Sequence, residues 1–257
     1  MKSRCFILIL GLFSLFQHLT YGKTPCPVES DSLLYNIQGK IYDAFLCSFQ
    51  ENGTMRLEAI EDQIKQLPVQ NQITTYWIAY AKYYEGVYQL KLRNKKQCQQ
   101  ILSSAIELIE QSGNRNSELY ALLAFIQSFS IQLSGGMNAA LISANVKKNA
   151  EAALQSDSTN LRAWYVLASN DYYTPKVYGG GKKCEKYLLK AISLNDQAMA
   201  NPFLPSWGKS DAYSLLIAYY IDKEDYDTAQ IYLNTAQALY PNNYMINQYA
   251  EMLKNKK

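Results

Sequence analysis

The chain has 257 residues, of which 48% are hydrophobic and 18% charged, with 12 Gly and 7 Pro. The apolar fraction excludes a disordered polymer, and Gly and Pro are too few for a collagen-like or linker-rich chain. A formal net charge of +3 also leaves the chain close to neutral.

The first 22 residues have the pattern of a secretory signal peptide. Lys2 and Arg4 precede twelve apolar residues at 5–16, and small residues stand before an expected cut after Gly22. A helix that spans a bilayer needs roughly 18–20 apolar residues, so this run is short for an anchor. We expect a signal peptide at 1–22 and one helical repeat domain at 23–257, periplasmic or secreted. A retained anchor or a buried first helix are the alternatives; no lipoprotein motif follows.

Cleavage would remove two basic residues and His18, the single histidine. The mature chain would then carry 23 Lys and Arg against 22 Asp and Glu, a net charge of +1. This balance argues against a nucleic-acid partner, which needs a concentrated basic face. Without histidine the chain lacks a Ser-His-Asp or Cys-His site and a histidine zinc site, and it has no Cys-x-x-Cys pair. We expect no catalytic residues, no metal and no cofactor, hence a non-enzyme.

Two other motifs are weak. Glu58, Glu61 and Asp62 could do acid–base chemistry only by proximity, and we expect them on a solvated helix face. Residues 179–183 (GGGKK) lack the spacing and the Ser or Thr of a phosphate-binding loop. We expect an enlarged turn there, with glycines supplying positive φ angles.

Helical periodicity dominates the mature chain. Apolar side chains recur every three or four residues, and Pro, Gly and Asn separate the runs. The expected helices lie at 33–49, 57–67, 76–92, 98–109, 117–133, 139–154, 160–173, 183–194, 211–221, 226–240 and 244–253. No run alternates with period two, so the predicted class is all-α.

Residues 213–241 show a pattern of residue types over two consecutive helices. An aromatic, a leucine and a tyrosine on one helix are followed by Ala, a large apolar residue, Ala and then Pro on the next; the residues are Tyr213, Leu216, Tyr220, Ala229, Leu233, Ala236 and Pro241. This resembles the tetratricopeptide repeat (TPR). The pattern returns upstream, with leading aromatics at Tyr35, Trp77, Tyr120, Trp164 and Tyr213.

The resemblance implies a right-handed α-solenoid of about five helix-turn-helix pairs plus a C-terminal capping helix. Small residues on the second helices, such as Ala229, let two helices approach closely while a large ring fills the space beside them. The leading aromatics are 42 to 49 residues apart, whereas the family period is 34, so the loops are enlarged.

Four cysteines remain after cleavage. Cys26 and Cys47 lie near the new N-terminus and could form a disulfide in an oxidising compartment. Cys98 and Cys184 occupy the small-residue slot of second helices, where a buried free thiol acts as a compact apolar residue.

The first helices of TPR-like pairs line the concave groove, which suggests a binding surface. On one face of the helix at 160–173, polar and tyrosine side chains recur at spacings of three and four. The candidate binding residues are Lys82, Glu85, Phe125, Arg162, Tyr165, Ser169, Tyr172, Tyr173 and Tyr178. Tyrosine combines contact area with a polar handle. Packing against the neighbouring repeat is the equally weighted alternative.

These features favour an exported, non-enzymatic scaffold that binds a protein or peptide in its concave groove. The alternative is a small-ligand or glycan binder with a Tyr-rich cleft near the 172–182 loop. The 172–182 segment resembles one in uncharacterised exported repeat proteins of Bacteroidetes-type bacteria.

Overall fold

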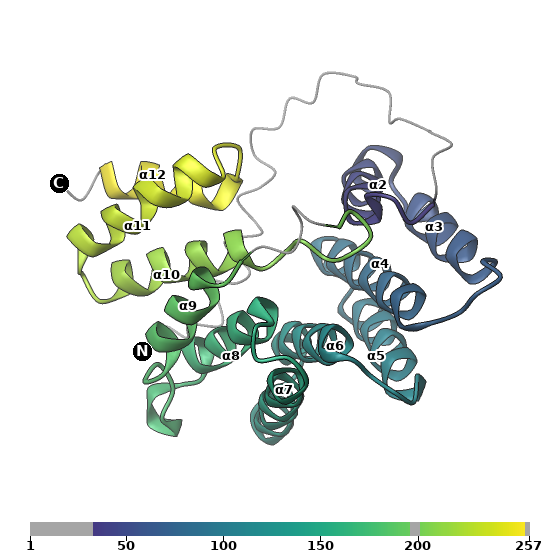
Figure 1. Ribbon diagram of the computed structural model, residues 1–257, viewed down its shortest axis with the longest axis horizontal. Helices are drawn as coiled ribbons and strands as arrows, with labels where there is room; N and C mark the ends of the chain where they lie inside the picture. The colour runs from purple at the N-terminus through teal and green to yellow at the C-terminus, as the bar shows by residue number, and fades with distance from the viewer. Residues whose placement is uncertain (1–32, 196–200, 255–257) are drawn as a thin grey trace. The chain divides into compact units, whose positions relative to one another are not determined.

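The computed structural model describes residues 33–195 and 201–254 and is all-α, as predicted; no strand occurs in these ranges (Figure 1). Short 3₁₀ turns lie at Ile131–Leu133 and Lys176–Tyr178. The α-helices are α2 (Ile37–Glu51), α3 (Met55–Lys65), α4 (Gln72–Lys91), α5 (Lys95–Gln111), α6 (Ser117–Ser130), α7 (Gly136–Ser156), α8 (Leu161–Tyr173), α9 (Cys184–Ser193), α10 (Lys209–Asp222), α11 (Tyr226–Leu239) and α12 (Tyr244–Lys254).

Asparagine side chains begin several helices. Asn71 Oδ1 accepts from the backbone N–H of Ile73 at 2.9 Å, and the Thr74 hydroxyl accepts from the Asn71 N–H at 2.8 Å. Asn116 and Asn160 cap α6 and α8 in the same way. Each cap satisfies a backbone donor that has no partner within the first turn. The helix predicted from residue 76 therefore begins earlier, at the polar turn that follows Asn71.

The described chain forms two compact units. The N-terminal unit holds α2 to α7 and residues 201–206, and the C-terminal unit holds α8 to α12. In the first, α2 packs on α3, α4 on α5 and α6 on α7, and the first helices of the pairs pack in the order α2, α4, α6. In the second, α8 packs on α9 and α10 on α11, while α10 also contacts α8 and α12. Paired helices are thus present in both units; the right-handed solenoid stays a prediction.

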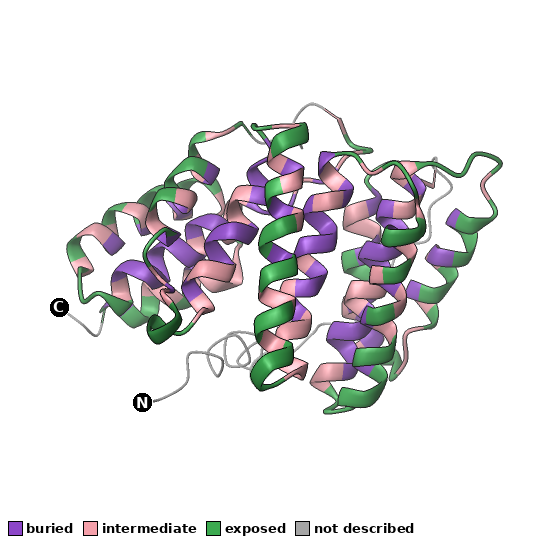
Figure 2. Ribbon diagram, turned by 90° about the horizontal axis from the view of Figure 1, so that it is seen from below, coloured by how far each residue is buried: buried purple, intermediate pink, exposed green. Residues whose placement is uncertain are grey.

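The small residues of the second helices lie in the core, as the packing argument predicts. Cys98, Ala150, Cys184 and Ala229 are fully buried. A small residue on a first helix has the same effect. At Gly86 on α4, an added Cβ would lie 2.8 Å from Leu102 Cδ2 on α5, so the two helices approach closely there. Figure 2 shows the buried residues along the helix sides that face neighbouring helices. Small side chains therefore set the distance between paired helices.

The loop before α9 is the enlarged turn expected from its glycines. Gly179 and Gly181 have φ of +88° and +78°, a region that side chains with a Cβ rarely adopt. Gly180 has no space for a side chain, because a Cβ would meet the Thr174 carbonyl oxygen. The Asp171 carboxylate accepts from the N–H groups of Lys183 and Cys184, both at 2.8 Å. The backbone donors at the start of α9 therefore already have an acceptor.

Several predictions concern residues outside the described ranges. The signal peptide at 1–22 and Cys26 both lie there. Cys47, on α2, is buried and disulfide-bonded. Cys98 and Cys184 are buried free thiols, as predicted, and burial raises the pKa of Cys98 to about 11. Among the described helices, none combines the length and the apolar character needed to cross a membrane.

Candidate functional site

Aromatic rings cover adjoining sides of α2, α4 and α6. We call this surface the aromatic face; it consists of Tyr42, Phe45, Tyr80, Tyr83, Tyr84, Phe125 and Phe129. Tyr84 on α4 contacts Tyr42 and Phe45 of α2, with ring centroids 6.0 and 4.8 Å apart. One residue earlier, Tyr83 contacts Phe125 and Phe129 of α6 at 4.8 and 5.1 Å. The rings therefore form one continuous network across three helices.

The spacing of aromatics along α4 explains this network. Tyr80 follows Tyr76 by four residues, and Tyr83 and Tyr84 follow Tyr80 by three and four, so the four rings share one side of the helix. Tyr80 and Tyr84 are linked through their hydroxyl oxygens, 3.4 Å apart. The result is a row of rings with hydroxyl groups along it.

Part of the aromatic face is accessible to solvent. Tyr42 is 44% exposed, and Tyr83, Tyr84 and Phe125 are half-buried. Tyr80 and Phe129 are buried beneath them. Exposed ring surface costs hydrophobic stabilisation, and when clustered it is typical of a binding surface.

Two depressions in the N-terminal unit lie away from the aromatic face. One, of about 260 Å³, lies between α5, α6 and α7, and another, of about 410 Å³, is lined by α5 alone. Neither is lined by a residue of the aromatic face, so a ligand on that face would occupy neither of them.

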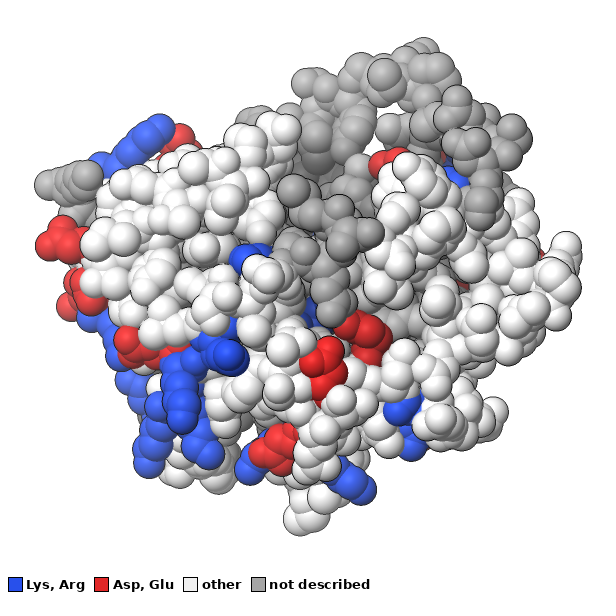
Figure 3. All heavy atoms as spheres, in the orientation of Figure 1, with Lys and Arg blue, Asp and Glu red and all other residues white. Residues whose placement is uncertain are grey.

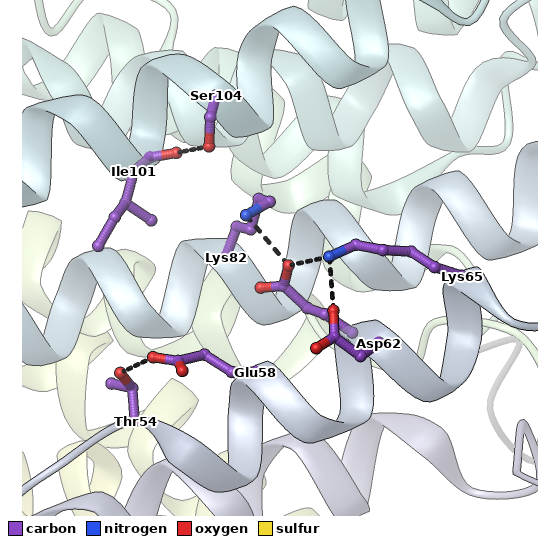
Figure 4. A network of polar contacts seen from close by, with 8 residues as sticks. Thr54, Glu58, Asp62, Lys65, Lys82, Ile101 and Ser104 are labelled. Atoms are coloured by element: carbon purple, nitrogen blue, oxygen red, sulfur yellow. Dashed lines mark hydrogen bonds and ion pairs between the residues drawn. The ribbon is translucent and has the colours of Figure 1, made fainter.

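Lys82 and Glu85 point away from the aromatic face, toward α3. Lys82 Nζ lies 3.0 Å from Glu61 Oε2, and Lys65 Nζ is 3.6 Å from the same oxygen (Figure 4). Glu61 and Glu85 are 3% and 6% exposed. The expectation that Glu61 lies on a solvated face is therefore wrong. Glu61 lies on the side of α3 that faces α4, whereas Glu58 and Asp62 are exposed.

The two buried carboxyl groups share a local environment. One oxygen of each, Glu61 Oε1 and Glu85 Oε1, lacks a hydrogen-bond partner among the described residues. Burial, and then the neighbouring Glu61 carboxylate, raise the pKa of Glu85 to about 9, against the opposing charge of Lys82. Glu85 is therefore neutral at pH 7. The pair joins α3 to α4.

The candidate residues on α8 lie mostly inside the C-terminal unit. Arg162 is fully buried, and its Nη1 donates to the Trp207 carbonyl oxygen at 3.3 Å. Tyr165, half-buried, packs edge-on against the Trp207 ring with centroids 6.4 Å apart. Ser169 is 9% exposed. For Arg162 and Ser169 the packing alternative holds, because α10 and the turn before it cover this side of α8.

Tyr172 is also buried, so the prediction that it lines a surface cleft is wrong. It is 2% exposed, and its hydroxyl donates to Asp222 Oδ2 on α10 at 2.5 Å. Burial and this bond raise the pKa of Tyr172 above its usual range. Tyr173 is half-buried against the Tyr172 ring, at 4.8 Å. Of the three candidate tyrosines in the 172–182 loop, Tyr178 is the exposed one, at 80%.

The basic cluster before and along α9 is exposed. Lys182, Lys183, Lys186 and Lys190 face solvent, opposite the buried positions of the helix. Figure 3 shows Lys and Arg side chains gathered at the lower left of the view. A run of like charges on one side of a helix is usually a solvated face, and the exposure of these four side chains fits that. No group of three His, Cys, Asp or Glu side chains suited to a metal ion occurs in residues 33–195 and 201–254.

Comparison with known proteins shows the fold. No family model matches the chain, and no curated protein matches it. The chain is similar in structure to the HusA haemophore from Porphyromonas gingivalis. The match has a TM-score of 0.56 and 18% sequence identity, and it covers 73% of this chain and 94% of that protein. The all-helical arrangement is therefore shared with a solved structure from the Bacteroidetes, and the TPR assignment stays a resemblance.

The sequence pattern missed the residues that make up most of the aromatic face. The candidate binding residues predicted from the sequence include Phe125 of this face but not Tyr42, Tyr83 or Tyr84. The signal that points to them is the run of four tyrosines on one side of α4, which exceeds what one TPR-like pair needs.

Proposed function

We propose that this protein is an exported, non-enzymatic binding protein that holds a flat, largely apolar ligand against the aromatic face. The observation that carries the proposal is the continuous, partly exposed ring network across α2, α4 and α6. Haem or a related tetrapyrrole is the first candidate ligand, because a protein of similar fold is a haemophore.

Stacking suits this surface better than coordination does. Rings of Tyr42, Tyr84, Tyr83 and Phe125 offer broad apolar contact, and the hydroxyls supply hydrogen bonds at the edge. The described residues contain no histidine, so recognition would rest on ring contacts and tyrosine hydroxyls. An open face also fits a ligand that is taken up and handed on.

Haem titration of the mature chain tests this proposal. Wild type is expected to bind with a shift of the Soret absorbance band. Tyr42→Ala should weaken binding about fivefold to tenfold, since it removes an exposed ring of the aromatic face. Tyr178→Ala is the matched control, because Tyr178 is exposed but lies in the C-terminal unit. Equal affinity of wild type and Tyr42→Ala, or no binding by wild type, would rule the haem site out.

An extended peptide is the second candidate ligand, consistent with the scaffold predicted from the sequence. It is favoured by one observation: the main chain of residues 201–206, which turns at 202–204, already makes hydrogen bonds to residues at the N-terminal ends of α2 and α4. Binding of wild type to a peptide array, with no response to haem and with loss in Tyr42→Ala, would favour this candidate.

The small-ligand site predicted at the 172–182 loop moves to the aromatic face in this proposal. Burial of Tyr172 leaves that loop with one exposed ring, which is too little area for a stacking platform. Export can be tested separately by N-terminal sequencing of the secreted or periplasmic protein, which should begin at Lys23.

A further inference from the structure

Residues 201–206, which we call the strap, lie against the N-terminal ends of α2 and α4. Its main-chain atoms make three hydrogen bonds there: the Asn36 N–H donates to the Pro202 carbonyl oxygen at 3.1 Å, Trp77 Nε1 donates to the Phe203 carbonyl oxygen at 3.1 Å, and the Ser206 N–H donates to Gln38 Oε1 at 2.7 Å. Within the strap Pro205 is buried, whereas Pro202 and Phe203 are exposed. The backbone bonds therefore hold the strap while the Phe203 side chain reaches the surface.

The strap turns Phe203 outward. This side chain is 36% exposed, and its ring stands edge-on to Tyr35, itself 48% exposed, at 6.0 Å and an interplanar angle of 79°. The sequence pattern placed Tyr35 in the packing between helices, but the turn before α2 leaves it at the surface. Two exposed rings held at a right angle forgo hydrophobic stabilisation that burial would supply.

Exposed aromatic side chains concentrate in this part of the molecule. In the described ranges, the large aromatics that are at least 36% exposed are Tyr35, Tyr42, Tyr178 and Phe203. All but Tyr178 belong to the N-terminal unit. Beneath the strap, the Trp77 ring contacts Tyr80 at 5.6 Å, and Tyr80 contacts Tyr84 at 5.2 Å. A row of ring contacts on α4 thus leads to the aromatic face from Trp77, which is joined to the strap by its hydrogen bond to the Phe203 carbonyl oxygen.

We propose that Phe203 and Tyr35 form a second contact surface for the flat ligand that binds the aromatic face. The strap positions Phe203 for this contact. This inference rests on the proposed function and names the part of the chain that would contact one end of the ligand. The perpendicular rings provide a corner in which a conjugated ring stacks on one side chain and meets the other with its edge. Because the hydrogen bonds from Asn36, Trp77 and Gln38 fix the backbone beforehand, little conformational entropy is lost on binding.

Haem titration of strap variants tests the inference. Phe203→Ala should weaken haem binding about tenfold, and Phe203→Tyr should restore it to within about twofold of wild type, since the ring is kept. Trp77→Phe removes the donor to the Phe203 carbonyl but keeps a ring in the core, so it should weaken binding severalfold. Tyr178→Ala is again the unaffected control, and far-UV circular dichroism checks that each variant folds.

The outcomes separate this inference from the proposed function. Suppose that wild type binds haem, that Tyr42→Ala binds it weakly and that Phe203→Ala binds it like wild type. This result would support the aromatic face as the binding site and contradict a role for Phe203 and Tyr35. Tighter binding by Phe203→Ala would overturn the corner and make the strap a competitor for the site. Absence of haem binding in wild type would remove both proposals.

Discussion

The two units of the molecule use tyrosine in opposite ways. In the N-terminal unit, rings on α2, α4 and α6 contact other rings, and Tyr42 reaches the surface. In the C-terminal unit, hydroxyls bond to carboxylates of neighbouring helices: Tyr172 to Asp222, and Tyr219 and Tyr220 to Glu185 at 3.1 and 2.8 Å. One unit displays its rings, and the other uses the phenol as a link between helices. Tyrosine content alone therefore does not locate a binding surface.

The buried tryptophan of the N-terminal unit tests this contrast most strongly. Trp77 is 1% exposed, so Trp77→Ala should destabilise the protein by about 3–5 kcal/mol through the cavity and the lost bond to the strap. Trp164→Ala, at a half-buried position on α8, should cost clearly less. Urea denaturation measures both, and equal losses would contradict the difference in burial.

The slot for small side chains gives the next largest effect. Ala229 on α11 is fully buried, in a core cluster with Leu216 and Leu233. Ala229→Leu should cost roughly 1–3 kcal/mol, because overpacking forces α10 and α11 apart. Ala229→Ser, which keeps the volume nearly unchanged, is the control. A urea midpoint for Ala229→Leu equal to that of wild type would refute the slot.

The linking role of the phenol can be measured directly. Tyr172→Phe deletes the hydroxyl that donates to Asp222 and leaves a carboxylate without that donor, at an expected cost of about 1–2 kcal/mol. Tyr178→Phe, at an exposed position, should leave stability unchanged. Thermal unfolding of the pair would show whether the bond between α8 and α10 contributes.

The carboxyl pair of the N-terminal unit predicts a pH dependence of stability. The pKa of Glu85 is raised to about 9, above its ordinary value near 4.5. Its neutral form stabilises the fold fully below pH 4.5, and this contribution is lost as the pH rises toward 9. Glu85→Gln should match wild type near pH 4 and be more stable by about 1 kcal/mol or more at pH 8 to 9.

The groups around Glu85 decide how sharp this test is. Glu61 on α3 opposes ionisation, whereas Lys82 favours it, and Lys65 approaches the Glu61 oxygen. Glu58 on α3 also opposes ionisation of Glu85, so the control is Glu107→Gln, at an exposed position on α5. Parallel stability–pH curves for wild type and Glu85→Gln would show that the pKa of Glu85 is not raised in the folded protein.

Much of the fold was predictable because its causes are local. Apolar spacing located the helices, and the small residues at Cys98, Cys184 and Ala229 identified the paired helices. Helix starts were less certain, since Asn71 and Asn116 act through side-chain hydrogen bonds that periodicity does not register. The candidate site was predicted only in part: tyrosine was the right residue type, but Tyr172 is buried and Lys82 and Glu85 face α3.

The sequence by itself determined the all-helical class, the order of the helices and the small-residue slots, because each depends on neighbours within a few turns. Only the tertiary structure decided which rings remain exposed, that Glu61 meets Glu85, and that Ser206 binds Gln38, 168 positions away. Periodicity states that a residue lies on the buried side of a helix or the exposed one. Which element covers that side depends on how distant segments fold together, and spacing along the chain carries no record of it.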